Sequence, residues 1–199
     1  VARTVDRRAL RTTEYTLRRY RSATLGNPIY QKHPDLKFTR IGELFESNRK
    51  PRDKPLQGIR VLDLGAGDGI WSVILAEQGA HVVSVEVSPR QVELARERMA
   101  VNNIFWDARV GSAFTLKKDL APARFDLIFG QGVLHHLTFD LPRVYRDCSD
   151  LLEDGGYAIF VEPVIGWPLL RTLREKISWM CPLDSESPDE RPLFQAEVM

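Results

Sequence analysis

The chain has 199 residues, of which 43% are apolar and 28% are charged. This balance is typical of a globular domain with a substantial core, and it excludes disordered and collagen-like chains. The net charge of +1 conceals an asymmetry, because residues 1–60 carry 15 Lys and Arg against six Asp and Glu, whereas residues 61–199 carry 13 against 21. The first 60 residues therefore form a distinct basic segment.

No stretch of 18 consecutive apolar residues occurs, so the sequence predicts no membrane span. The N-terminus lacks the basic-then-apolar pattern of a secretory signal. Two cysteines, Cys148 and Cys181, are too few for a disulfide framework or a metal set. Reduced thiols, with Cys148 buried on a helix face, are typical of a reducing compartment, and we expect a cytoplasmic protein.

The basic segment begins with an Arg-rich amphipathic pattern over residues 3–22, which predicts a helix. Glycine and prolines at 23–40 indicate a loop, a short helix is expected near 40–47, and 49–58 is typical of a connector. We expect one domain boundary, with residues 1–58 separate from a core at 59–199. The charge favours either an anionic partner or a solvated helix face docked on the acidic core.

From residue 59 onward, short apolar strands alternate with amphipathic helices. This order predicts a doubly wound α/β fold with a parallel sheet of five strands. Ser88, Pro89 and Gln91 match a capping box at the start of one helix, and Gly155-Gly156 is expected to end another. The expected strands are 60–64, 81–86, 105–110, 125–130 and 157–161, and the expected helices are 70–78, 89–101, 141–154 and 166–179, followed by a C-terminal loop.

A glycine-rich loop, Asp63–Gly69, joins the first predicted strand to the first helix. Ligands in open α/β sheets bind beyond the carboxyl ends of the strands, and glycines there let the backbone approach closely. A dinucleotide fingerprint would require glycine where this chain has Ile70. Glu86 ends the second strand, where a carboxylate can accept hydrogen bonds from a ribose diol. The pattern predicts an adenosine-type ligand.

Several segments carry a family resemblance. Val61–Gly69 resembles motif I of class I S-adenosylmethionine (SAM)-dependent methyltransferases, and Phe125–Leu137 resembles the motif IV region of their small-molecule branch. Leu151–Phe160 is similar to the helix-to-strand turn that follows. Glu162-Pro163 and Asp189–Leu193 resemble a bacterial subgroup related to methyltransferase types 11 and 25. The resemblance covers about residues 59–193.

The resemblance implies a Rossmann-like sheet, an N-terminal helical lid and SAM or S-adenosylhomocysteine as cofactor, without a metal. Asp63 and the glycines would hold the methionine part, Glu86 the ribose and Val87 the adenine, with Gln131 near the sulfonium. Family members often read the adenine amine with an acid where this chain has Ser112. The implied cofactor-binding residues are Asp63, Gly65, Ala66, Gly67, Gly69, Glu86, Val87, Ser112, Ala113 and Gln131.

Three titratable side chains at the expected ligand edge are candidate catalytic residues. His135 and His136 follow the fourth strand and can act as a base or a hydrogen-bond donor, or one of them packs under the loop. Glu162 ends the fifth strand and either orients an acceptor hydroxyl or amine or binds nearby backbone amides. No third ligand with helical spacing accompanies the histidines, so a metal role is not expected.

The sequence therefore predicts a SAM-dependent methyltransferase acting on an O, N or C atom of a small molecule by in-line displacement. The alternatives are a non-catalytic SAM-binding module or an RNA-directed enzyme, although no Asn/Asp-Pro-Pro-Tyr/Phe signature of base-amine methylation follows the fourth strand. Class I sheets usually have a sixth and a seventh strand, which residues 180–199 are too short to supply. We expect them to be missing, with further chain or a second copy covering the sheet edge.

Overall fold

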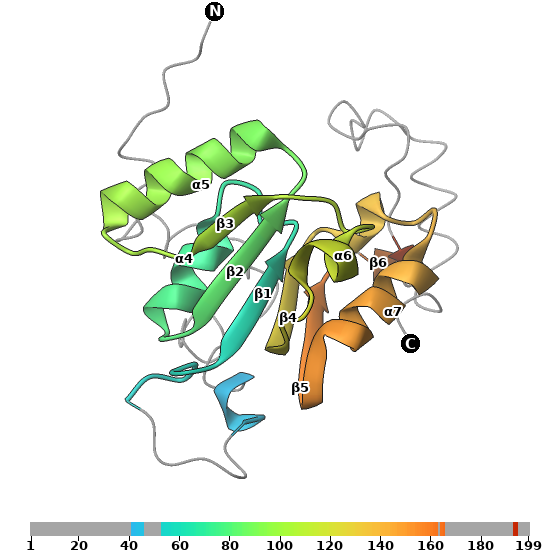
Figure 1. The fold of residues 1–199 in the computed structure, drawn as a ribbon, viewed down its shortest axis with the longest axis horizontal. Coiled ribbons are helices and arrows are strands. Elements are labelled where there is room, and N and C mark those ends of the chain that lie inside the picture. Colours follow the sequence, from blue (N-terminus) through green and yellow to red (C-terminus); the bar gives the residue numbers. More distant parts are fainter. Residues whose placement is uncertain (1–40, 46–52, 163, 166–192, 195–199) are drawn as a thin grey trace, which may run out of the picture.

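The computed structural model describes residues 41–45, 53–162, 164–165 and 193–194. The predictions for 3–22, 23–40, 166–179, Cys181 and the C-terminal loop lie outside these residues. A parallel five-stranded sheet with the order β3-β2-β1-β4-β5 forms the centre (Figure 1). Its strands are β1 (Arg60–Leu64), β2 (His81–Glu86), β3 (Asp107–Val110), β4 (Phe125–Gln131) and β5 (Leu152–Val161). The predicted doubly wound sheet is confirmed.

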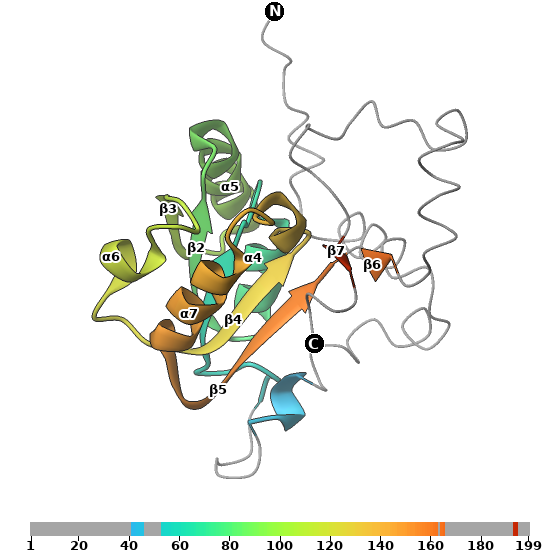
Figure 2. The same ribbon diagram turned by 90° about the vertical axis from the view of Figure 1, so that its right-hand side faces the viewer.

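Helices cover both faces of this sheet (Figure 2). On one face lie α4 (Ile70–Glu77) and α5 (Pro89–Asn102), and on the other lie α6 (Leu116–Leu120) and α7 (Leu141–Leu151). Side chains of β1 alternate between the faces, because Leu62 and Leu64 pack in the core under α6 and α7, whereas Val61 packs in the core under α4. The chain reverses direction across the sheet between β1 and β4, which places a switch point there.

The start of α5 follows the predicted capping pattern only in part. Ser88 is the N-cap, its hydroxyl accepts the Gln91 N–H at 3.4 Å, and Pro89 occupies the first turn. The N–H of Ser88 donates to Oε1 of Glu86 at 2.9 Å, in place of the Gln91 side chain that a capping box requires. The carboxylate is the stronger acceptor and leaves the reciprocal half of the box unformed.

The boundary between α7 and β5 differs from the prediction. The helix ends at Leu151, and β5 begins at once with Leu152, so Gly155 and Gly156 lie inside the strand. Pairing with β4 is irregular there, since the register jumps from Phe125–Leu152 to Leu127–Tyr157. The glycines therefore form a bulge, and regular pairing starts where the sequence predicted the strand. The short elements α6 and η4 (Leu134–His136, a 3-10 turn) were not predicted.

The described residues also contain two short strands outside the predicted five-stranded sheet. β6 (Val164–Ile165) and β7 (Leu193–Phe194) pair in parallel with each other in a separate two-stranded sheet. Neither joins the main sheet, so among the described residues β5 and β3 are its edges. The expectation that further chain or a second copy covers the β5 edge stays a prediction.

One residue of the predicted short helix near 40–47 and one of the predicted connector pack into the main core. Ile41, Leu56 and Ile59 share one buried cluster with residues of β1, β4 and α4. This packing joins residues on both sides of the predicted domain boundary at residue 58, and the boundary itself stays a prediction. Cys148 is buried on α7, as expected, and burial raises the pKa of its thiol to about 12. None of the described helices combines the length and apolarity that a bilayer span requires.

Candidate functional site

A cavity of about 480 Å³ opens at the carboxyl ends of the parallel strands. This is the edge where open α/β sheets bind ligands, and the volume is in the usual range for small-molecule sites. Six of the predicted cofactor residues line it, namely Gly65, Gly67, Glu86, Val87, Ser112 and Ala113. The other lining residues include Gln91, Phe114, Gly132, Val133, His136 and Leu137. None of them was predicted to contact the cofactor, and His136 was predicted as a candidate catalytic residue.

The glycine loop owes its shape to three residues in the left-handed region. Gly65, Gly67 and Gly69 have φ angles of 68°, 54° and 75°. A Cβ on Gly65 would lie 2.8 Å from Cβ of Val133, and one on Gly69 would lie 2.7 Å from the Trp106 ring. A Cβ on Gly67 would meet nothing within 4 Å. Gly65 and Gly69 are therefore required by packing, whereas Gly67 leaves open space for a ligand to approach the backbone.

Glu86 ties the loop to the neighbouring helix. Its Oε2 accepts the N–H of Gly67 at 3.0 Å, and its Oε1 accepts the N–H of Ser88 at 2.9 Å. A carboxylate has about four acceptor positions, so each oxygen keeps one for a further donor. The side chain lines the cavity in this orientation. Its geometry fits the predicted contact with two vicinal hydroxyls.

Asp63 lies away from the cavity surface. Its side chain is buried within β1, and Oδ2 accepts a hydrogen bond from the Ser72 hydroxyl at 2.6 Å. Burial raises its pKa to about 7; the Ser72 hydrogen bond opposes this shift, and the charge of Glu86 adds to it. The acid at the start of the loop therefore joins β1 to α4 and sets the local charge beneath the loop.

Asp63→Asn is expected to raise stability at alkaline pH. The folded state retains a proton on Asp63 up to about pH 7, whereas an unfolded Asp loses it near 3.8. The contribution of Asp63 to the free energy of unfolding is therefore largest below the pKa of the unfolded state, and it decreases as pH rises towards the pKa of the folded state. The neutral amide can still accept from Ser72 and removes this loss, so the variant should gain about 2 kcal/mol on the wild type between pH 5 and pH 8. Urea unfolding at the two pH values measures it.

An equal stability difference at pH 5 and pH 8 would contradict the role of Asp63. Glu93→Gln, in the exposed pair with Arg90 on α5, is the control and should show no comparable change.

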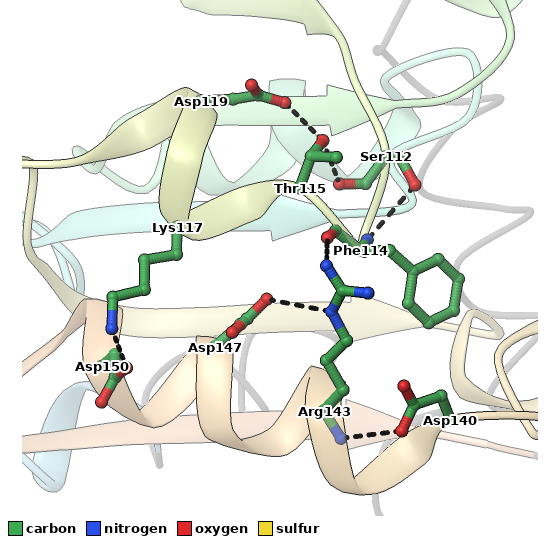
Figure 3. A network of polar contacts seen from close by, with 9 residues as sticks. All are labelled: Ser112, Phe114, Thr115, Lys117, Asp119, Asp140, Arg143, Asp147 and Asp150. Atoms are coloured by element: carbon green, nitrogen blue, oxygen red, sulfur yellow. Dashed lines mark hydrogen bonds and ion pairs between the residues drawn. The ribbon is translucent and has the colours of Figure 1, made fainter.

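The adenine end of the predicted site is fixed by a network between β3, α6 and α7 (Figure 3). The Ser112 hydroxyl accepts the Phe114 N–H at 3.2 Å, and the Phe114 carbonyl accepts a guanidinium N–H of Arg143 at 2.7 Å. The Phe114 ring packs on that of Phe139, with centroids 4.4 Å apart. Among the described residues, the Ser112 hydroxyl accepts a hydrogen bond but donates none, so its proton is available to a ligand. Phe114 adds an aromatic face.

Besides Asp63, three predicted cofactor residues do not line the cavity. Ala66 and Gly69 belong to the glycine loop but are not part of the cavity wall. Gln131 is the last residue of β4 and pairs in register with Val161. Val133 and Leu137 line the cavity instead, from the loop and the 3-10 turn beyond β4. That turn could not be placed from the sequence, because its path is set by a contact with β5.

The contact is made by Glu162, at the end of β5. Oε1 accepts the N–H groups of Val133 and Leu134 at 2.7 and 2.8 Å, and Oε2 lies 2.8 Å from Nδ1 of His135. The Glu162 side chain is 2% exposed. An ionised carboxylate only accepts, so Nδ1 of His135 donates to it, and Nε2 is the acceptor in the neutral imidazole. The interpretation that Glu162 binds nearby backbone amides is therefore confirmed, whereas its orientation of an acceptor hydroxyl or amine stays a prediction.

The two histidines have different surroundings. His136 lines the cavity, whereas His135 lies behind it, and their rings are 4.1 Å apart. The Glu162 carboxylate orients the His135 ring through Nδ1. The arrangement gives an imidazole of fixed tautomer beside a ligand cavity, which can accept a proton. Across the described residues, no group of three or more His, Cys, Asp or Glu side chains is arranged to hold a metal ion.

A second cavity, of about 410 Å³, lies at the opposite edge of the sheet. Arg60, Trp106 and Arg124 contribute to its walls. It contains none of the predicted site residues, and it lies at the amino ends of the strands, away from the switch point. We therefore place the candidate site at the carboxyl edge.

Residues 61–156 match the family model of a methyltransferase domain. They include the glycine loop, Glu86 and the segment with both histidines. Over these residues the chain is similar to a methyltransferase domain, which supports the predicted resemblance to class I, SAM-dependent methyltransferases.

Two curated relatives of the methyltransferase domain are ubiquinone biosynthesis O-methyltransferases. The protein from Xylella fastidiosa is 36% identical over 110 residues, which are 55% of this chain and 44% of the relative. That from Cereibacter sphaeroides is 35% identical over 137 residues, covering 66% of this chain and 53% of the relative. The chain thus spans about half the length of the curated relatives it matches.

Solved structures show the same fold. The YcgJ protein from Bacillus subtilis superposes with a TM-score of 0.60 at 19% identity, covering 81% of this chain and 63% of that chain. The PH0226 protein from Pyrococcus horikoshii gives 0.53 at 20% identity, covering 78% and 66%. At these identities the likeness extends to the architecture of the methyltransferase domain.

Proposed function

We propose that this protein transfers a methyl group from SAM to a hydroxyl oxygen of a small molecule, with His135 accepting the hydroxyl proton and Glu162 orienting the His135 ring. The observation that carries the oxygen assignment is the buried carboxylate 2.8 Å from Nδ1 of His135. Deprotonation by a positioned base assists a hydroxyl, which is a poor nucleophile while protonated. The relatives named as O-methyltransferases support the same choice.

The residues around the cavity suit SAM. Gly67 exposes backbone to open space, Glu86 has acceptor positions for the ribose hydroxyls, and Val87 is 70% exposed as an apolar surface for the adenine. Ser112 and Ala113 would contact the edge of the base. Bound SAM supplies a methyl group already activated by a sulfonium, so the chain has to bind, orient and exclude water. The proposal assigns no role to a metal ion.

In the proposed transfer, the acceptor proton passes to Nε2 of His135 while the acceptor oxygen forms a bond to the methyl carbon. The carbon–sulfur bond breaks and its electron pair stays on sulfur. Glu162 keeps the Nδ1 proton in place and stabilises the imidazolium that forms. His136, on the cavity wall, would contact the bound molecules and is assigned no proton transfer.

The test is turnover with SAM and a panel of small acceptors bearing a phenolic hydroxyl, an aliphatic hydroxyl, an amine or an activated carbon. We expect S-adenosylhomocysteine to appear only with hydroxyl acceptors, with the methyl group found on oxygen by mass spectrometry. Calorimetry should show binding of S-adenosylhomocysteine. Binding without turnover of any acceptor would leave a SAM-binding module and contradict the proposed enzyme, and methylation confined to nitrogen would contradict the base.

A further inference from the structure

Arg98 is a buried cation beside the glycine loop. It comes from α5, its side chain is 2% exposed, and it is among the largest fully buried side chains of the described chain. Nε donates to the carbonyl oxygen of Asp68 at 2.9 Å, and Nη2 lies 2.5 Å from Oδ2 of Asp68. One guanidinium therefore holds both the backbone and the side chain of a single loop residue.

This arrangement is not the best one for stability. Nη1 of Arg98 is buried and has no hydrogen-bond partner among the described residues. An unpaired buried donor is costly, and burying a cation removes its hydration. Apolar side chains of similar volume often replace buried ion pairs without loss of stability. The Asp68 side chain is 33% exposed, so its charge stays hydrated when the arginine is removed.

The contact of Arg98 with Asp68 restrains the backbone of the glycine loop. Asp68 stands between Gly67 and Gly69, both in the left-handed region, so the backbone on either side is free to rotate. Glu86 accepts the N–H of Gly67, and Arg98 donates to the carbonyl of Asp68, two peptide units further along the loop. The loop is thus anchored from β2 and from α5 at adjacent residues, and Gly67 faces the cavity between these anchors.

We propose that Arg98 is a positioning residue that holds the glycine loop in its ligand-binding conformation at the expense of stability, without touching the ligand. This inference rests on the proposed function, because the loop has to bind the SAM skeleton. Freezing one backbone residue costs as much free energy as about a tenfold change in affinity. Loss of the anchor should weaken binding by about that factor, since binding would then have to order the loop.

The test uses the full chain with Arg98→Met, which fills similar volume without charge. Calorimetry with S-adenosylhomocysteine should give a dissociation constant about tenfold higher than the wild type, while the melting temperature without ligand is unchanged or higher. Arg98→Lys keeps a cation with less complete geometry and should recover part of the affinity. Arg90→Met, on the exposed face of the same helix, is the control and should change neither quantity.

Opposite movement of affinity and stability supports the proposal. Affinity within twofold of the wild type in Arg98→Met would overturn it, and so would a melting temperature that falls in step with affinity, since a merely structural arginine lowers both. Amide exchange at residues 66–69 without ligand should be about tenfold faster in Arg98→Met, and unchanged exchange would also overturn it. A wild type that binds no S-adenosylhomocysteine would refute the proposed function, and the exchange measurement would still decide the role of Arg98.

Discussion

Glu162→Gln is expected to lower kcat for methyl transfer by about 10²- to 10³-fold. The glutamine oxygen can still accept the N–H groups of Val133 and Leu134, which fixes the amide so that its NH₂ group faces His135. Nδ1 of His135 must then be the acceptor, and the ring proton moves to Nε2. The imidazole keeps its place but can no longer take a proton from a hydroxyl there.

Steady-state kinetics together with calorimetry isolate this effect. The dissociation constant for S-adenosylhomocysteine should stay within threefold of the wild type, because the cavity wall is retained. The loss in kcat should shrink with an acceptor whose hydroxyl is already ionised at the assay pH, since no proton then has to be removed. Glu153→Gln, in the exposed pair with Arg60, is the control. A kcat within threefold of the wild type would show that His135 is not the base.

Local patterns predicted the parts of the site that depend on neighbours in sequence. The glycine loop and Glu86 belong to one strand–helix–strand unit, so their spacing alone placed them at one edge of the sheet. The residues Gly65, Gly67, Glu86 and Val87 accordingly reach the cavity as predicted. Asp63 shows the limit of this reasoning. The sequence places it correctly at the start of the glycine loop, but its side chain is buried in the core.

Contacts between distant segments could not be derived in the same way. Glu162 and His135 are 27 residues apart, and only the parallel pairing of β4 with β5 brings them together. The sequence left open whether Glu162 binds backbone amides or orients a reacting group, and its carboxylate contacts both the loop amides and His135. The roles of these residues in catalysis stay predictions until the variants are measured.

Arg98 is a charged residue on the buried face of α5, and sequence patterns alone did not single it out. The helix Pro89–Asn102 carries several exposed charged side chains, and its buried apolar residues are Val92, Ala95 and Met99. Arg98 lies three residues after Ala95 and next to Met99, which places it on that same face. A cation at a core position is a conflict between local pattern and fold, and such conflicts concentrate where function sets the structure.

Gly65→Ala is expected to remove the ligand site and to lower the free energy of unfolding by about 2–4 kcal/mol. The residue has a φ of 68°, where an L side chain is strained, and its Cβ would lie 2.8 Å from Cβ of Val133. Val133 cannot move freely, because it is buried and its N–H is held by Glu162. The loop must therefore change its path, and the dissociation constant for S-adenosylhomocysteine should rise at least tenfold.

Gly58→Ala separates backbone strain from the clash. Gly58 has a similar φ of 74°, but a Cβ there would meet nothing within 4 Å. This variant should lose only about 1 kcal/mol and bind S-adenosylhomocysteine as the wild type does, since strain alone acts there. Urea unfolding and calorimetry on both variants give the comparison. Equal losses of stability in the two variants, with binding retained in both, would show that contact between the glycine loop and Val133 does not shape the cavity.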